Sequence, residues 1–149
     1  MSKRLRREEK IELLAKLPLF ENCTKRELGS IAAIMVEADK PRGSFLTREG
    51  QDGGLMFVIV QGEAEVLAHD DSTEGHRVIG HLDTGDVVGE LSLIDGRARS
   101  ATVRAVTDVR LLEIVQDDFQ ALVTSSPKFV RNLLRALSLR VREMDTLTS

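Results

Sequence analysis

The stretch that decides the fold is residues 85–106, GDVVGELSLIDGRARSATVRAV. It begins with a turn signal at Gly85-Asp86, and Asp95-Gly96 ends any helix that starts at Gly89 within two turns. Backbone N–H groups at a helix start point towards negative charge, and glycine lets that backbone come close to a ligand. Arg99 then supplies a fork of donors that matches two phosphate oxygens. The pattern therefore predicts a site for a small anion.

Glu90 lies among these donors and, when ionised, can only accept hydrogen bonds. A phosphate would repel this carboxylate, whereas a neighbouring sugar hydroxyl would donate to it. Glu90 and Arg99 considered alone would more simply form a surface ion pair. Both interpretations remain open on these two residues.

The two halves of the stretch, residues 89–91 (GEL) and 96–102 (GRARSAT), resemble the phosphate-binding cassette of cyclic nucleotide-binding domains. Both halves stand at the family's spacing, which favours ligand binding over the surface ion pair. The departures are small: Val88 stands where phenylalanine is usual, Ser92 where alanine is frequent and Ala98 where proline is common. The resemblance covers residues 10–143, almost the whole chain.

The resemblance implies a role for each part of the cassette. Arg99 would pair with the cyclic phosphate, and Glu90 would accept a hydrogen bond from the ribose 2′-hydroxyl. Ser100 implies that cGMP is tolerated beside cAMP, and the last helix would close over the base. The ligand-binding residues expected on this basis are Val88, Gly89, Glu90, Leu91, Ser92, Arg99, Ser100, Ala101, Val103, Leu137 and Arg140.

Composition favours one globular domain. The chain has 149 residues, of which 42% are hydrophobic and 30% charged, so it can bury a core and is not disordered. Its net charge of −3 gives no basic excess for nucleic acid. The longest apolar run, Leu55 to Val60, is too short to cross a membrane, and the N-terminus lacks the apolar core of a signal peptide. The single cysteine fits a reducing compartment. We therefore expect a cytoplasmic protein without nucleic-acid or membrane partners.

Helical periodicity is confined to the two ends of the chain. Residues 9–17 place apolar side chains on one helical face, and Pro18 ends that helix. Thr24 and Glu27 form a capping box that starts a second helix, which we expect to end near Asp39. After residue 116 we expect a helix that opens at Asp117, followed by the final helix over residues 127–144.

Between these helices the period changes to two. Strands are predicted over residues 44–48, 55–61, 63–68, 77–82, 87–88, 101–106 and 109–115. Many short strands separated by glycine turns predict an antiparallel sandwich or barrel. The resemblance makes this an α+β domain built on an antiparallel jelly roll of about eight strands. We expect a single domain over residues 1–149, with N-terminal helices in 9–40, the jelly roll in 43–115 including the cassette in 85–103, and C-terminal helices in 117–144.

The final helix carries a heptad stripe. Its apolar residues are spaced four, three, four and three apart, namely Val130, Leu134, Leu137, Val141 and Met144. The stripe packs either on the chain's own barrel or on the same helix of a second copy. Two heptads are too few to form a coiled coil by themselves, so the sequence leaves both alternatives open.

Metal and catalytic chemistry find little support in the sequence. The three histidines, His69, His76 and His81, lack the tight spacing of a metal site. No Ser/His/Asp arrangement has the context of a nucleophile, and nothing in the cassette is placed to attack a phosphodiester. We therefore expect no metal, no cofactor and no enzymatic activity.

These observations predict a non-catalytic cyclic nucleotide sensor that prefers cAMP and tolerates cGMP. No effector segment is recognisable in the sequence, so we expect output through an unknown effector protein in trans, or through homodimerisation by the C-terminal helix. One alternative is a jelly-roll protein-interaction or dimerisation module that has lost its ligand. The other is a cupin-like metalloenzyme.

Overall fold

The computed structural model describes residues 4–51, 53–70, 72, 75–89 and 101–148, without the side chains of Arg140 and of residues 143–148. The chain divides into two compact units. Residues 35–119 form one, called here the β unit, and residues 1–34 with 120–149 form the other, called the helical unit. Each is described by itself.

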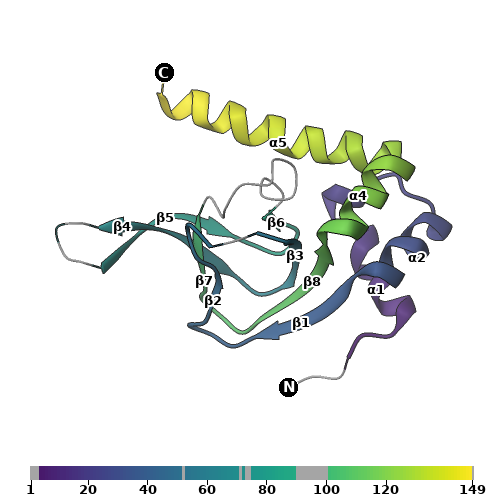
Figure 1. Ribbon diagram of the computed structural model, residues 1–149, viewed down its shortest axis with the longest axis horizontal. Helices are drawn as coiled ribbons and strands as arrows, with labels where there is room; N and C mark the ends of the chain where they lie inside the picture. Colours follow the sequence, from purple (N-terminus) through teal and green to yellow (C-terminus); the bar gives the residue numbers. More distant parts are fainter. Residues whose placement is uncertain (1–3, 52, 71, 73–74, 90–100, 149) are drawn as a thin grey trace. The chain divides into compact units, whose positions relative to one another are not determined.

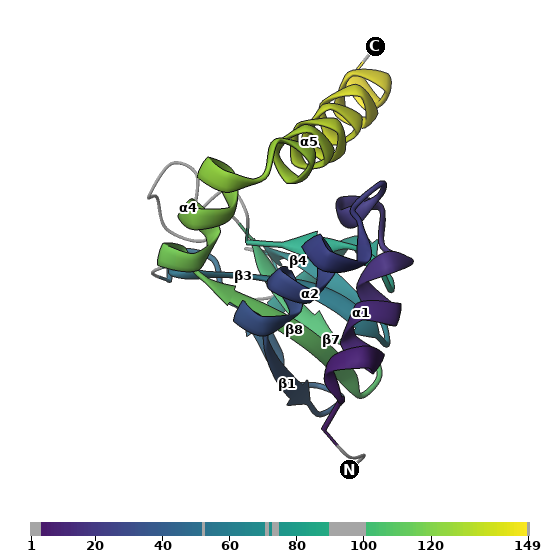
Figure 2. The same cartoon turned by 90° about the vertical axis from the view of Figure 1, so that its right-hand side faces the viewer.

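The helical unit contains the helices predicted at both ends of the chain. Figure 2 shows α1 and α2 packed side by side. They bury one apolar face each, with Ile11 and Leu14 on α1 and Leu28 and Ile31 on α2. The elements are α1 (Arg7–Ala15), the 3₁₀ helix η1 (Pro18–Phe20), α2 (Lys25–Ile34), α4 (Gln116–Ser125), whose first four residues belong to the β unit, and α5 (Pro127–Thr148).

The predicted capping box at the start of α2 is confirmed. The Glu27 N–H donates to Thr24 Oγ1 at 3.1 Å, and the Thr24 N–H donates to Glu27 Oε1 at 2.8 Å. Each residue thus satisfies a backbone donor that the helix start leaves unpaired. Pro18 does not close α1, which ends at Ala15, but opens η1.

The described residues of the β unit form eight strands in two antiparallel sheets, whose labels are shown in Figure 1. One sheet has the order β1-β8-β3-β6 and the other the order β2-β7-β4-β5, called here sheets A and B. This confirms the predicted fold class. The strands are β1 (Val36–Lys40), β2 (Phe45–Thr47), β3 (Leu55–Gln61), β4 (Ala64–Asp70), β5 (Gly75–Leu82), β6 (Val87–Val88), β7 (Thr102–Ala105) and β8 (Val109–Val115).

The two sheets share one apolar core. Sheet A contributes residues of β3 and β8, and sheet B contributes residues of β4 and β7. Because these side chains pack as one cluster, the two sheets face each other across it. The buried cluster consists of Phe57, Ile59, Ala64, Val103, Ala105, Val109 and Leu111.

Strand β1 corrects the sequence prediction. The second helix was expected to end near Asp39, but α2 ends at Ile34 and residues 36–40 pair with β8. A buried arginine explains the strand: Arg110 Nε lies 2.9 Å from Asp39 Oδ1 and 3.2 Å from Glu37 Oε1. The carboxylates of β1 compensate this charge on β8, which would be costly to bury alone.

Candidate functional site

The predicted cassette lies between β6 and β7. β6 pairs with β3 at the edge of sheet A, and β7 is an inner strand of sheet B. Residues 90–100 therefore connect one sheet to the other. Five predicted site residues, Glu90, Leu91, Ser92, Arg99 and Ser100, lie outside the described residues, so their predicted roles stay predictions.

The entry to the cassette is a turn held on β3. The Gly85 N–H donates to the Ile59 carbonyl at 2.7 Å, and the Ile59 N–H donates to the Asp86 carbonyl at 3.0 Å. Asp86 Oδ2 also accepts from the Asp83 N–H at 2.7 Å, which closes the turn. Gly89, the last described residue before residues 90–100, has a φ of +90°. Only glycine adopts this conformation readily, and this agrees with the glycine that the motif requires.

The exit of the cassette is held by two buried threonines. Thr47 Oγ1 donates to the Ala101 carbonyl at 2.8 Å, and Thr102 Oγ1 accepts from the Glu49 N–H at 2.9 Å. Both threonines are buried. They fix Ala101 and Thr102, the first described residues after residue 100, to the end of β2 and to Glu49 beyond it.

The remaining predicted site residues fall into two groups. Val88 and Val103 are in the β unit, where both pack in or against the core cluster, and Ala101, which precedes Thr102, is half-buried. Val103 is only 2% exposed, so its side chain can meet a ligand only from inside the barrel. Leu137, which is half-buried, and Arg140 belong to α5 of the helical unit.

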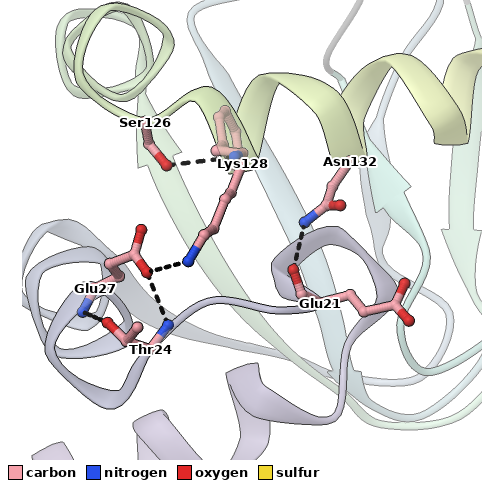
Figure 3. A network of polar contacts seen from close by, with 7 residues as sticks. Glu21, Thr24, Glu27, Ser126, Lys128 and Asn132 are labelled. Carbon is pink, nitrogen blue, oxygen red and sulfur yellow. Dashed lines mark hydrogen bonds and ion pairs between the residues drawn. The ribbon is translucent and has the colours of Figure 1, made fainter.

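Within the helical unit, polar side chains attach the start of α5 to the segment between η1 and α2 (Figure 3). Asn132 Nδ2 donates to the carbonyls of Leu19 and Glu21 at 2.9 and 3.0 Å. Lys128 Nζ lies 3.0 Å from Glu27 Oε1. The Phe20 and Phe129 rings stack beside these contacts with centroids 6.1 Å apart.

Two groups in this network have shifted pKa values. The pKa of the Glu27 carboxyl is lowered, first by the hydrogen bond from the Thr24 backbone and then by that from Lys128. The pKa of the Cys23 thiol is raised, mainly by burial and further by the Glu27 carboxylate. Because the thiolate is the reactive form, this raised pKa disfavours Cys23 as a nucleophile.

The described part of the chain contains neither a cluster of metal ligands nor a membrane-spanning helix. No group of three or more His, Cys, Asp and Glu side chains is arranged there to hold a metal. No described helix combines the length and apolar character that crossing a membrane requires.

Comparison with known proteins identifies the family. A family model described as "Cyclic nucleotide-binding domain" matches residues 39–126, more than half of the chain. The match contains the complete cassette. The chain belongs to the cyclic nucleotide-binding domain family.

The relatives of this chain are proteins of different kinds. A cyclic nucleotide-gated potassium channel of Rhizobium etli is 39% identical over 127 residues, which cover 82% of this chain and 32% of the channel. A cyclic AMP receptor protein of Thermus thermophilus is 30% identical over 129 residues, 86% of this chain and 59% of that protein. A solved cyclic nucleotide-binding domain from Methylobacillus flagellatus has a TM-score of 0.77 at 29% identity, covering 92% of this chain and 79% of that one. The chain thus spans less than two thirds of both curated relatives.

Sequence reasoning missed one residue next to the site. Thr47 was predicted only as part of a strand, because its partner Ala101 is 54 residues away. An alternating pattern marks Thr47 as a sheet residue but does not identify the carbonyl that it meets. Thr102 was recognised as part of the motif, yet its bond to the Glu49 N–H was not foreseen.

Proposed function

We propose that this chain is a non-catalytic sensor that binds cAMP, tolerates cGMP and passes the signal to a partner in trans. The observation that carries the proposal is the cassette itself. Both motif halves stand in register between β6 and β7, in a chain whose family is the cyclic nucleotide-binding domain. The similarity to the cyclic AMP receptor protein of Thermus thermophilus supports cAMP as the ligand.

In this proposal Arg99 forms the charge-assisted pair with the cyclic phosphate, because a guanidinium can give two parallel hydrogen bonds to its oxygens. Backbone N–H groups of residues 89–91, 100 and 101 complete the cradle, and Glu90 accepts from the ribose 2′-hydroxyl. The cassette sequence contains no histidine, cysteine or lysine between Gly89 and Thr102. Carboxylates can also act as general bases, but of the two here, Glu90 and Asp95, the proposal assigns Glu90 to the ribose hydroxyl and gives neither a role in cleaving the phosphodiester.

Selectivity in this proposal depends on the base. cAMP and cGMP share the phosphate and ribose, so the cassette cannot separate them strongly. Leu137 and Arg140 of α5 are proposed to cover the purine, and a guanidinium can stack on either base. We expect cAMP to be favoured by about tenfold, or ~1.4 kcal/mol.

Signalling follows from a shift between conformations. A ligand shifts such an equilibrium only by the difference in its affinity for the two states. We propose that the closed state binds the nucleotide more tightly and that the effector distinguishes the two states.

The test is calorimetric titration of three proteins with cAMP and with cGMP. The proteins are the wild type, Arg99→Ala and a matched control, Arg104→Ala. Arg104 is in β7 and pairs with Glu65 at 2.6 Å, outside the proposed site. Removing Arg99 is expected to cost about 2–5 kcal/mol, roughly 30- to 5000-fold in affinity, while Arg104→Ala binds as the wild type does. Near-wild-type affinity in Arg99→Ala would overturn the assignment. A folded wild type that binds neither nucleotide would favour the interaction module that has lost its ligand.

The C-terminal helix is the proposed homodimer surface. Leu134 and Val141 of the heptad stripe are 61% and 57% exposed. The same face repeated on a second copy would bury both residues. Leu134→Glu should then convert a dimer to a monomer in light scattering, and a wild type that is already monomeric at micromolar concentration would exclude this interface.

A further inference from the structure

His69 and His76 lie directly opposite each other on β4 and β5, although seven positions separate them in the sequence. The two strands form a hairpin (Figure 1). The neighbouring pairs Ala68↔Arg77 and Asp70↔Gly75 keep the ladder regular around the histidines, since the register shift falls earlier, between Val66 and Leu67. The register therefore fixes both imidazoles on the same face of the hairpin.

The surroundings leave this pair accessible. Both histidines are exposed, and their ring centroids are 6.5 Å apart at an interplanar angle of 82°. The Phe45 ring flanks His76, with centroids 6.1 Å apart. Arg77 is the next residue along β5, so its side chain points to the opposite face of the strand. The Arg48 guanidinium, however, lies over the same Phe45 ring, 3.9 Å from its centroid, and its positive charge near His76 opposes a bound cation and weakens the site.

We propose that His69 and His76 together bind a divalent transition-metal ion such as Zn²⁺, Ni²⁺ or Cu²⁺. Neutral imidazole is a preferred ligand for all three ions. Opposed residues on antiparallel strands have Cβ atoms about 4.5–5.5 Å apart, close enough for both rings to reach one ion. With Zn–N bonds of about 2.0–2.1 Å and tetrahedral geometry, the ring centroids would be about 5 Å apart. Rotation of the two exposed side chains can close the difference from the observed 6.5 Å.

Among the described residues, no third His, Cys, Asp or Glu side chain joins these two ligands. The site is therefore weaker than a structural zinc site, which uses four protein ligands. His81 is not part of the site, because it faces Glu65 further along the same ladder. The site is separate from the cassette and does not depend on the proposed nucleotide function.

The experiment is calorimetric titration of the full chain, after removal of any polyhistidine tag, with ZnCl₂ and with NiCl₂. The wild type should bind one ion per chain. His69→Ala and His76→Ala should each weaken binding by about tenfold or more, which is ~1.4 kcal/mol. His81→Ala and Cys23→Ser are the controls and should bind as the wild type does. Zn²⁺ should also raise the thermal midpoint of the wild type but not of the His69 and His76 variants.

The proposal is overturned if the wild type binds no ion, or if His81→Ala or Cys23→Ser loses as much affinity as His69→Ala. Arg99→Ala separates this proposal from the nucleotide site. That variant should keep the metal affinity of the wild type whether or not it binds cAMP.

Discussion

The buried amide of Asn132 should contribute more to the stability of the helical unit than the ion pair beside it. Its Nδ2 donates to the Leu19 and Glu21 carbonyls at 2.9 and 3.0 Å, and the residue is only 5% exposed. Asn132→Ala removes both donors and leaves the carbonyls without them. An unsatisfied buried carbonyl costs about 1–3 kcal/mol. We therefore expect the free energy of unfolding to fall by about 2–4 kcal/mol.

Arg135 provides the matched control, because it attaches the same helix to the same residue. Its Nη1 lies 3.2 Å from Glu21 Oε2, but the two side chains are 54% and 58% exposed. Exposed ion pairs of this kind contribute about 0–1 kcal/mol. Arg135→Ala should therefore be close to wild type, and its small effect should shrink further at high salt because the charges are screened.

The measurement is urea unfolding followed by far-ultraviolet circular dichroism, because the chain has no tryptophan or tyrosine for fluorescence. Unfolding free energies of both variants are compared with the wild type at low and high salt. If Arg135→Ala loses as much stability as Asn132→Ala, the reasoning from burial is refuted. The reasoning is also refuted if the unfolding free energy of Asn132→Ala differs from that of the wild type by less than about 0.5 kcal/mol, the usual range of surface substitutions.

Three further predictions use the same unfolding assay. Gly50→Ala should cost about 1–2 kcal/mol of backbone strain alone, because a Cβ at Gly50 would meet open space. Gly62→Ala should cost about 2–5 kcal/mol, because steric overlap adds to the same strain. A Cβ at Gly62 would stand 2.5 Å from a backbone carbonyl oxygen. Equal losses would contradict this. Arg110→Met should cost about 3–5 kcal/mol because two carboxylates of β1 lose their partner, and an unchanged midpoint would contradict the account of β1. The pKa of Glu27 is lowered in the folded state. The Glu27 carboxylate therefore adds fully to the free energy of unfolding above its ordinary pKa of about 4.3, and this contribution is lost as the pH falls through the lower folded-state pKa. Glu27→Gln should therefore lose less unfolding free energy than the wild type when the pH is lowered, and an unchanged pH profile in this variant would refute the prediction.

Local signals allowed much of the fold to be predicted. The strands at residues 55–61, 87–88 and 109–115 have the predicted boundaries, since continuous or β-branched apolar runs between turn residues specify strands directly. The capping box at Thr24 was also predicted correctly, because both of its partners lie within one helical turn. The cassette was recognised as a motif for the same reason.

Features that depend on distant partners could not be predicted. Residues 36–40 carry three charged side chains, and nothing nearby shows that Arg110, 71 residues from Asp39, will be buried against them. The histidine spacings are not tight, which in the sequence speaks against a metal site, and a spacing of seven shows no pairing of His69 with His76 until the hairpin register is known. Strand register brings these residues together, and alternation alone does not specify register.

The described structure also shows how the two ends of the predicted cassette are held. Both of its ends are held by groups outside the motif: the entry turn bonds to Ile59 of the core strand β3, and the exit bonds to Thr47 at the end of β2. Val88 and Val103, on either side, pack in or against the same core cluster. A site whose flanks are already ordered loses less conformational entropy when the ligand binds. Because these contacts reach both sheets, a change in the cassette on binding has a direct structural connection to each of them.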